Sequence, residues 1–198
     1  MNEQNELTKY EEKGLSVFNS IESFELAQRV ASALSNSSLV PKEYQKNIPN
    51  TLIALEMANR IGASPLMVMQ HLYIIHGKPS WSSAFLISAI NSCGKFDPLN
   101  FEVSGKGDSL KCTAWTNDRK GNKLESPEVT MDMAKKEGWV QKNGSKWQTM
   151  PELMIRYRAA SFFSRLYCPE ITMGMQTMEE VKDVVYSVDL DNATLTEK

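Results

Sequence analysis

The sequence has few cysteines and lacks the long apolar runs that are typical of membrane proteins and of secretory signal peptides. It contains three cysteines in 198 residues, and no apolar run approaches the ~20 residues that a membrane-spanning helix needs. The N-terminal residues lack the apolar stretch of a secretory signal peptide. Cys93, Cys112 and Cys168 lie far apart in apolar contexts, which predicts reduced packing residues rather than disulfides. We therefore expect a cytoplasmic protein without a membrane segment.

Motifs for phosphate chemistry and for nucleophilic catalysis are also absent. The chain contains neither a G-x-x-x-x-G-K-[ST] loop nor a G-x-S-x-G turn. Its acidic residues lie mainly near the ends or in turns, which disfavours a two-metal nuclease site. His71 and His76 have no cysteine or carboxylate at ligand spacing. The sequence therefore predicts a protein that is not an enzyme and binds no metal or cofactor.

The net charge of −2 hides an uneven distribution. Residues 1–27 carry six acids and two bases, and residues 166–198 carry seven acids and two bases. Residues 135–165 instead carry two acids and seven bases, which are Lys135, Lys136, Lys142, Lys146, Arg156, Arg158 and Arg165. A basic centre between acidic ends favours contact with a polyanion, and an ordinary solvated face is the alternative.

Apolar spacing and capping residues predict several helices in the first half of the chain. Helices are expected over 20–34, over 51–61 with Asn50 as N-cap and Gly62 after the last turn, over 66–70 and over 83–93. The stretch HLYIIH, residues 71–76, predicts a short strand that a turn at 77–79 connects to a second strand or a helix entry.

From residue 100 to residue 130 the apolar period changes to two. Three segments separated by Gly, Asn and Asp turns predict a three-stranded antiparallel meander, with Leu110, Cys112 and Ala114 on one side. Lys111, Thr113 and Trp115 are expected on the other. Thr130 is a predicted N-cap for a helix that ends at Gly138.

The expected fold class is therefore α+β, with a small antiparallel β-meander of about three strands and a short hairpin, flanked by helices. We expect a flexible N-terminal segment over 1–19, a single α+β domain over 20–186, and an acidic C-terminal tail over 187–198.

The stretch from Ser145 to Arg165 has the strongest helix signals. Thr149 and Glu152 form a T-x-x-E pattern, Pro151 suits a first turn, and a helix is predicted over 150–167. Arg158 and Arg165 share one stripe, whereas Arg156 points to the far side. Because the remaining circumference is apolar, we expect a buried helix whose arginines reach a partner or a cleft. A second T-x-x-E pattern at Thr177 and Glu180 predicts another helix start.

A loop with two tryptophans and two lysines, WVQKNGSKW, precedes this helix. Aromatic rings interleaved with cations suit a single strand of nucleic acid, because bases stack on the rings while the cations follow the phosphates. Trp147 is the stacking candidate. The alternative is that Trp139 and Trp147 anchor the loop to the core.

Trp147, Met154 and Arg156 form the pattern W-x6-M-x-[K/R], and IALEMANRIGASPLMVMQHLYIIHGKPSWSSAFLISAINSCGKF precedes it. In both features, over roughly residues 49–183, the chain resembles the RecT/Redβ-like family of phage single-strand annealing proteins (recombinases). Many relatives carry an arginine where this chain has Ser161. The resemblance implies an α+β core that assembles into rings or helical filaments. It also implies a protein that binds single-stranded DNA and annealed duplex without ATP in a bacterial host cell, with a phage exonuclease or a host single-strand-binding protein as a further partner.

The leading hypothesis is therefore ATP-independent binding and annealing of single-stranded DNA in phage recombination. The expected DNA-binding residues are Lys135, Lys136, Lys142, Lys146, Trp147, Arg156, Arg158 and Arg165. The main alternative is a non-catalytic protein-interaction adaptor in which the arginines bridge buried carboxylates. A nuclease-like enzyme would require dependence on divalent metal.

Overall fold

The computed structural model describes residues 17–75 and 77–183, and these form two compact units that divide in the sequence between Gln70 and His71. The expected acidic tail over 187–198 and most of the expected segment over 1–19 lie outside the described residues. The expected boundaries, with one domain over 20–186, stay predictions, because the cooperativity of unfolding would decide whether the two units fold together.

The first unit is helical. Its helices are α1 (Ile21–Ser35), α2 (Ile48–Ile61) and α3 (Pro65–His71), whose last residue falls in the second unit. Small residues spaced four apart, Ala27 and Ala31 on α1 and Ala54 and Ala58 on α2, are buried where these two helices pack. The N-cap of α2 is Asn47 rather than the predicted Asn50, because the helix already includes Pro49 in its first turn. Gly62 ends it in the left-handed conformation, as predicted.

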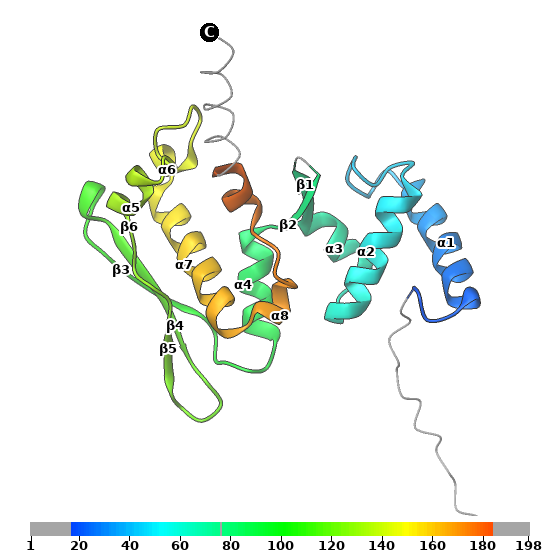
Figure 1. Ribbon diagram of the computed structural model, residues 1–198, viewed down its shortest axis with the longest axis horizontal. Helices are drawn as coiled ribbons and strands as arrows, with labels where there is room; N and C mark the ends of the chain where they lie inside the picture. The colour runs from blue at the N-terminus through cyan, green and yellow to red at the C-terminus, as the bar shows by residue number, and fades with distance from the viewer. Residues whose placement is uncertain (1–16, 76, 184–198) are drawn as a thin grey trace, which may run out of the picture. The chain divides into compact units, whose positions relative to one another are not determined.

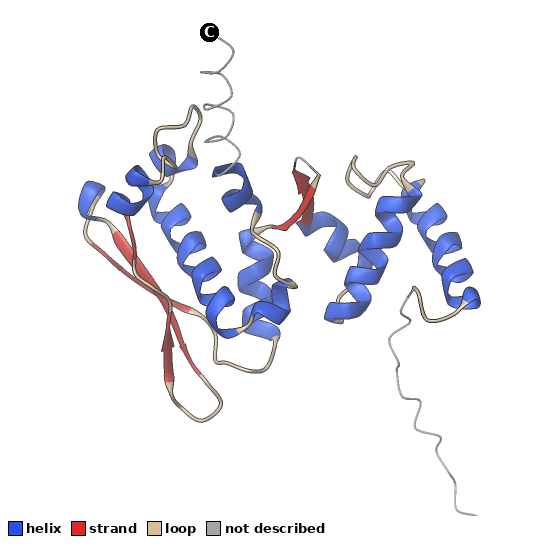
Figure 2. Cartoon of the chain, viewed as in Figure 1, coloured by secondary structure: helices blue, strands red, loops and turns tan. Residues whose placement is uncertain are grey.

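The second unit contains all the described strands. β1 (Leu72–Ile75) and β2 (Lys78–Trp81) form a hairpin, which confirms the short strand predicted there. β3 (Asn100–Ser104), β4 (Lys111–Asn117), β5 (Lys123–Glu125) and β6 (Val129–Thr130) form an antiparallel sheet with β4 at its centre. The third strand of the predicted meander is split into β5 and β6 at Ser126, whose hydroxyl accepts the N–H of Ala114 at 3.0 Å. The α+β fold class is confirmed (Figure 2).

Several helices of the second unit pack around α7 (Pro151–Tyr167), which itself packs on the sheet. The helices are α4 (Ser83–Ser92), α5 (Met131–Lys136), α6 (Lys146–Thr149), α7, α8 (Pro169–Thr172) and a helical segment over residues 178–183, and η1 (Gly107–Ser109) is a 3-10 turn. α7 lies between the sheet and α4 (Figure 1). The predicted inward side of β4, with Leu110, Cys112 and Ala114, is buried against α7 in the core.

The start of α7 differs from the prediction. Thr149 belongs to the short α6. Met150, with φ −140° and ψ 55°, has a non-helical backbone conformation and separates α6 from α7. The N-cap of α7 is therefore Met150, without a side-chain cap, and the predicted box at Thr149 and Glu152 is wrong. The second box is confirmed, since Glu180 Oε2 accepts the N–H of Thr177 at 2.9 Å and Thr177 Oγ1 accepts the N–H of Glu180 at 3.4 Å.

None of the described helices is both long enough and apolar enough to cross a membrane.

Candidate functional site

The arginines on the shared stripe of α7 are paired with carboxylates of the same chain. Arg158 is only 7% exposed, and its Nη2 lies 2.5 Å from Asp183 Oδ2. Its Nη1 lies 3.9 Å from Glu180 Oε1, and its guanidinium lies over the ring of Trp139 at 3.7 Å. A guanidinium that a carboxylate and an indole cover on two sides has its charge satisfied inside the second unit.

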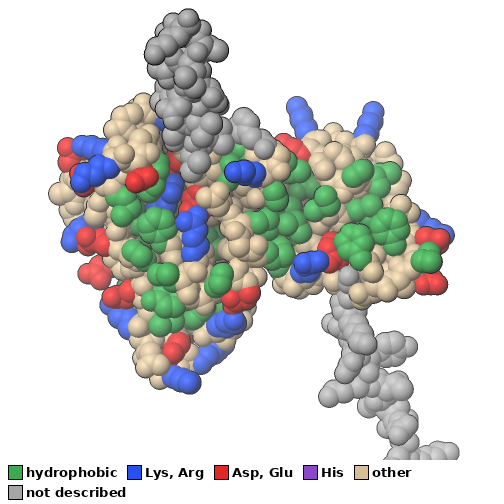
Figure 3. All heavy atoms as spheres, in the orientation of Figure 1, with side chains coloured by type: hydrophobic (Ala, Val, Ile, Leu, Met, Phe, Trp, Pro, Cys, Tyr) green, Lys and Arg blue, Asp and Glu red, His purple; other side chains and the backbone are tan. Residues whose placement is uncertain are grey.

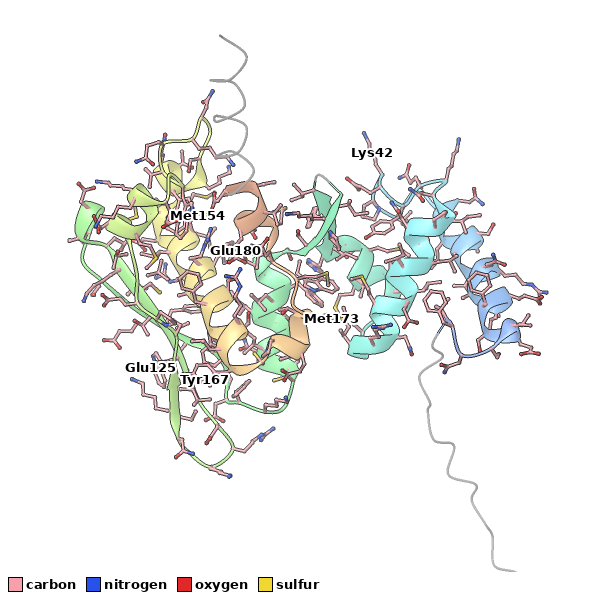
Figure 4. All side chains as sticks on the ribbon, viewed as in Figure 1. Lys42, Glu125, Met154, Tyr167, Met173 and Glu180 are labelled. Atoms are coloured by element: carbon pink, nitrogen blue, oxygen red, sulfur yellow. The ribbon has the colours of Figure 1, made fainter. Side chains whose placement is uncertain are left out.

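Glu180 connects Arg165 to the same cluster. Its Oε1 lies 2.5 Å from Arg165 Nη2, while its Oε2 caps the helix that begins after Thr177. Figure 4 shows Glu180 beside α7. The acidic C-terminal stretch thus neutralises part of the basic centre. The expectation that Arg158 and Arg165 reach out of α7 toward a polyanion is corrected: both are held by carboxylates that lie close only after folding.

Burial acts against the charges of the Arg158–Asp183 pair. It lowers the pKa of Arg158 and raises the pKa of Asp183. Asp183 and Glu180 act on the pKa of Arg158 in the opposite direction, and Arg158 does the same for Asp183. Each partner thus favours the charged form of the other in the core, and removal of one takes away part of the charge that offsets burial of the other.

Both tryptophans of the predicted aromatic loop lie in the core. Trp147 is 1% exposed, its ring centroid is 5.2 Å from that of Trp139, and its indole N–H donates to Asp183 Oδ2 at 3.3 Å. The faces of the Trp147 ring are therefore not open to a base. This arrangement favours the alternative in which the two rings anchor the loop.

Three further predicted residues form pairs near the surface. Lys135 Nζ lies 2.6 Å from Asp108, Lys136 Nζ lies 2.7 Å from Asp132, and Arg156 donates to the carbonyl of Glu152 at 2.7 Å. Pairs this exposed contribute little to stability, and their cations still contribute to the field around the chain. They are not brought together at one site.

The remaining predicted residues, Lys142 and Lys146, stand on the rim of a groove with a volume of about 310 Å³. Gly144, with φ +72°, allows the turn between them. One wall is a stripe of α7 at helical spacing, Met150, Leu153, Met154 and Tyr157. The opposite wall comes from residues 178–183, with Met178 and a third lysine, Lys182. The amine of Lys142 donates to the carbonyl of Lys182 at 3.0 Å and so connects the two sides.

The two acids that line the groove are engaged by donors of their own chain. Glu179 Oε2 accepts the hydroxyl of Ser83 at 2.7 Å and its N–H at 3.3 Å. Asp183 accepts from Arg158 and Trp147. Lys146 and Lys182 are exposed, and they form no salt bridge with any described residue.

Sequence reasoning missed two groove residues, Tyr157 and Lys182. Tyr157 could have been found, because its spacing from Met150 and Leu153 places all three on one stripe. Lys182 could not, because its place beside Lys142 depends on the long-range contacts of residues 178–183. No group of three or more potential metal ligands exists among the described residues.

Comparison of the chain with protein-family models, with curated proteins and with solved structures finds no match.

Proposed function

We propose that the protein binds single-stranded DNA and anneals complementary strands without ATP, acting as a homo-oligomer in phage recombination in the bacterial cytoplasm. The observation that carries this proposal is the groove between α7 and residues 178–183, which three lysines and the apolar stripe at the start of α7 line together. The resemblance to RecT/Redβ-like annealing proteins adds support, since the motif residues Met154 and Trp147 lie at or beside this groove.

The groove suits the two parts of a nucleic-acid strand. Lysine ammonium groups attract phosphates and release the counterions condensed on them, which makes such binding dependent on salt. Neutralising phosphates also reduces the repulsion between two strands that must pair. Many subunits on one strand would act together, so that a weak individual site can still produce tight binding. DNA contact is therefore assigned to Lys142, Lys146 and Lys182 rather than to the arginines of α7.

The test is binding of a fluorescent single-stranded oligonucleotide, followed by annealing of two complementary strands in the absence of ATP. Wild-type protein should bind at low salt and should weaken steeply as salt rises. A variant with Lys142→Ala, Lys146→Ala and Lys182→Ala should lose most of both activities and show a shallower salt dependence. Loss of three phosphate contacts reduces the slope of log K against log salt by about 2 for a single strand.

The matched control replaces three lysines outside the groove, Lys106, Lys120 and Lys136, by alanine. This variant changes the net charge by the same amount, so a loss limited to the groove variant identifies a local site rather than the field of the whole chain. Equal losses in both variants, or no binding of wild type at low salt, would reject the proposal.

A protein-interaction adaptor is the second candidate, and an apolar hollow in the first unit favours it. Val17, Leu26, Ala27, Leu55 and Pro65 are among the residues that line a hollow of about 290 Å³. Nearby on α1 and before it, exposed apolar side chains such as Ile21 (76%) add to a hydrophobic surface, which Figure 3 shows over α1 and α2. Absence of oligonucleotide binding at low salt would favour this candidate.

A further inference from the structure

We infer that the groove takes an unstacked base of the bound strand and that Tyr157 is the residue on which this base stacks. The inference rests on the proposed function and specifies it further. It explains how this site could distinguish single-stranded from double-stranded DNA. The lysines alone cannot make that distinction, because both kinds of DNA carry phosphates.

The first support is a partly exposed apolar stripe at the start of α7. Met150 and Leu153 are 42% and 39% exposed, whereas Ile155, Ala159 and Phe163 on other sides of α7 are fully buried. Four side chains at i, i+3, i+4 and i+7 thus line one wall of the groove, of which Met150 and Leu153 are the most exposed. An apolar wall beside three cations matches the two chemistries of a single strand, bases and phosphates.

The second support is the state of the Tyr157 side chain. It is half-buried in the wall of the groove, and its hydroxyl has no hydrogen-bond partner among the described residues. Its ring packs against the core and also lines the groove. A tyrosine placed in this way can stack on a base and also donate its hydroxyl to a base edge or a phosphate. In a duplex the faces of the bases are covered by their neighbours, so only a single strand can offer a base to this ring.

Trp115, another partly exposed aromatic of the second unit, fits less well. Trp115 lies on the outer side of β4, where Lys123 approaches its ring at 4.9 Å. Its cross-strand neighbour is Glu125, and Glu102 stands opposite Thr113 on the same side. The cation near this ring is itself paired with Glu125. Beside Tyr157, in contrast, Lys146 and Lys182 form no salt bridge with any described residue, so the groove offers phosphates more available positive charge.

The experiment compares two fluorescent oligomers of equal length, oligothymidylate and the corresponding abasic strand, with the full chain. Wild-type protein should bind oligothymidylate more tightly. Tyr157→Leu should weaken binding of oligothymidylate by about tenfold, within the range of base–aromatic stacking, and leave binding of the abasic strand unchanged. Tyr157→Phe keeps the ring and should retain the preference. Leu153→Ser, at an exposed position, should reduce the preference without affecting the fold.

Each outcome decides between the two levels of the proposal. If Tyr157→Leu weakens neither oligomer or both equally, the base-stacking role is rejected, while the lysine groove stands. If Tyr157→Leu does not fold, as circular dichroism would reveal, Leu153→Ser decides: an unchanged preference rejects the inference and a selective loss supports it. If wild type binds neither oligomer, the proposed function itself fails.

Discussion

At the scale of single residues, two arginines of α7 only two positions apart have different roles. Arg158 is buried between Trp139 and two carboxylates, whereas Arg156 is partly exposed and contacts Glu152 one turn earlier. The sequence assigned both to DNA phosphates. Their environments instead predict losses of different size on substitution, because removal of Arg158 deprives the buried Asp183 of its guanidinium partner.

We expect Arg158→Ala to lower the free energy of unfolding by about 3–5 kcal/mol, and Arg156→Ala by less than about 1 kcal/mol. Chemical denaturation followed by circular dichroism would measure both. Replacing both partners with apolar residues, Arg158→Met with Asp183→Leu, should recover much of the loss, because no buried charge is then left without a partner. Similar losses for Arg158→Ala and Arg156→Ala would contradict a structural role for Arg158.

At the scale of elements, the two T-x-x-E patterns of the chain behave differently. Thr177 is buried and exchanges hydrogen bonds with Glu180 at the start of a helix. Thr149 is exposed within α6, and α7 begins two residues later without its hydroxyl. Thr177→Ala should therefore lower the free energy of unfolding by about 1 kcal/mol, and Thr149→Ala by less than about 0.5 kcal/mol, in the same denaturation experiment. Equal effects would contradict the observed N-cap of α7.

These elements also show what the sequence can and cannot predict. Alternating burial along β4 follows directly from the period of two, so Leu110, Cys112 and Ala114 could be placed correctly. The Thr149 pattern gave a wrong N-cap for α7, because the four residues of the motif do not reveal the non-helical conformation of Met150.

The site was harder to predict than the sheet. Lys142 and Lys146 could be assigned to one loop, but the pairing of Arg158 with Asp183, 25 residues later, depends on tertiary packing. Local patterns of charge therefore indicate a basic stretch, but they do not show which of its side chains are paired within the folded chain.

At the scale of the whole molecule, distant segments meet around residues 176–183. The backbone N–H of Trp81 donates to the carbonyl of Gln176 at 3.2 Å. Glu179 accepts the hydroxyl of Ser83, and Glu180 pairs with Arg165. Residues 176–183 are thereby connected to α4 and to α7 within the second unit. A net charge of −2 and a pI near 5.8 do not exclude a basic site, because acids and bases of the chain cancel where they meet and leave lysines at the groove.

Two buried cysteines in the core of the second unit are expected to make the protein less stable at alkaline pH. Burial raises the pKa of Cys112 to about 11 and that of Cys168 to about 12, against an ordinary value of 9.0. Above pH 9.0 the unfolded chain therefore binds fewer protons than the folded chain, and the free energy of unfolding falls as the pH rises. For each thiol the loss approaches ~1.4 kcal/mol per pH unit until its folded pKa is reached.

We expect urea denaturation at a series of pH values to show this decline between pH 9.0 and about 10, before tyrosines and lysines titrate. The Cys112→Ala, Cys168→Ala variant will be less stable at every pH, because each substitution removes buried volume. Its decline over this interval should nevertheless be much shallower, since the two thiols that release protons on unfolding are gone. A variant with Cys93→Ala, which removes the half-buried cysteine, should keep the steep decline. If the double variant retained the full slope, the alkaline sensitivity would arise from groups other than these two buried thiols.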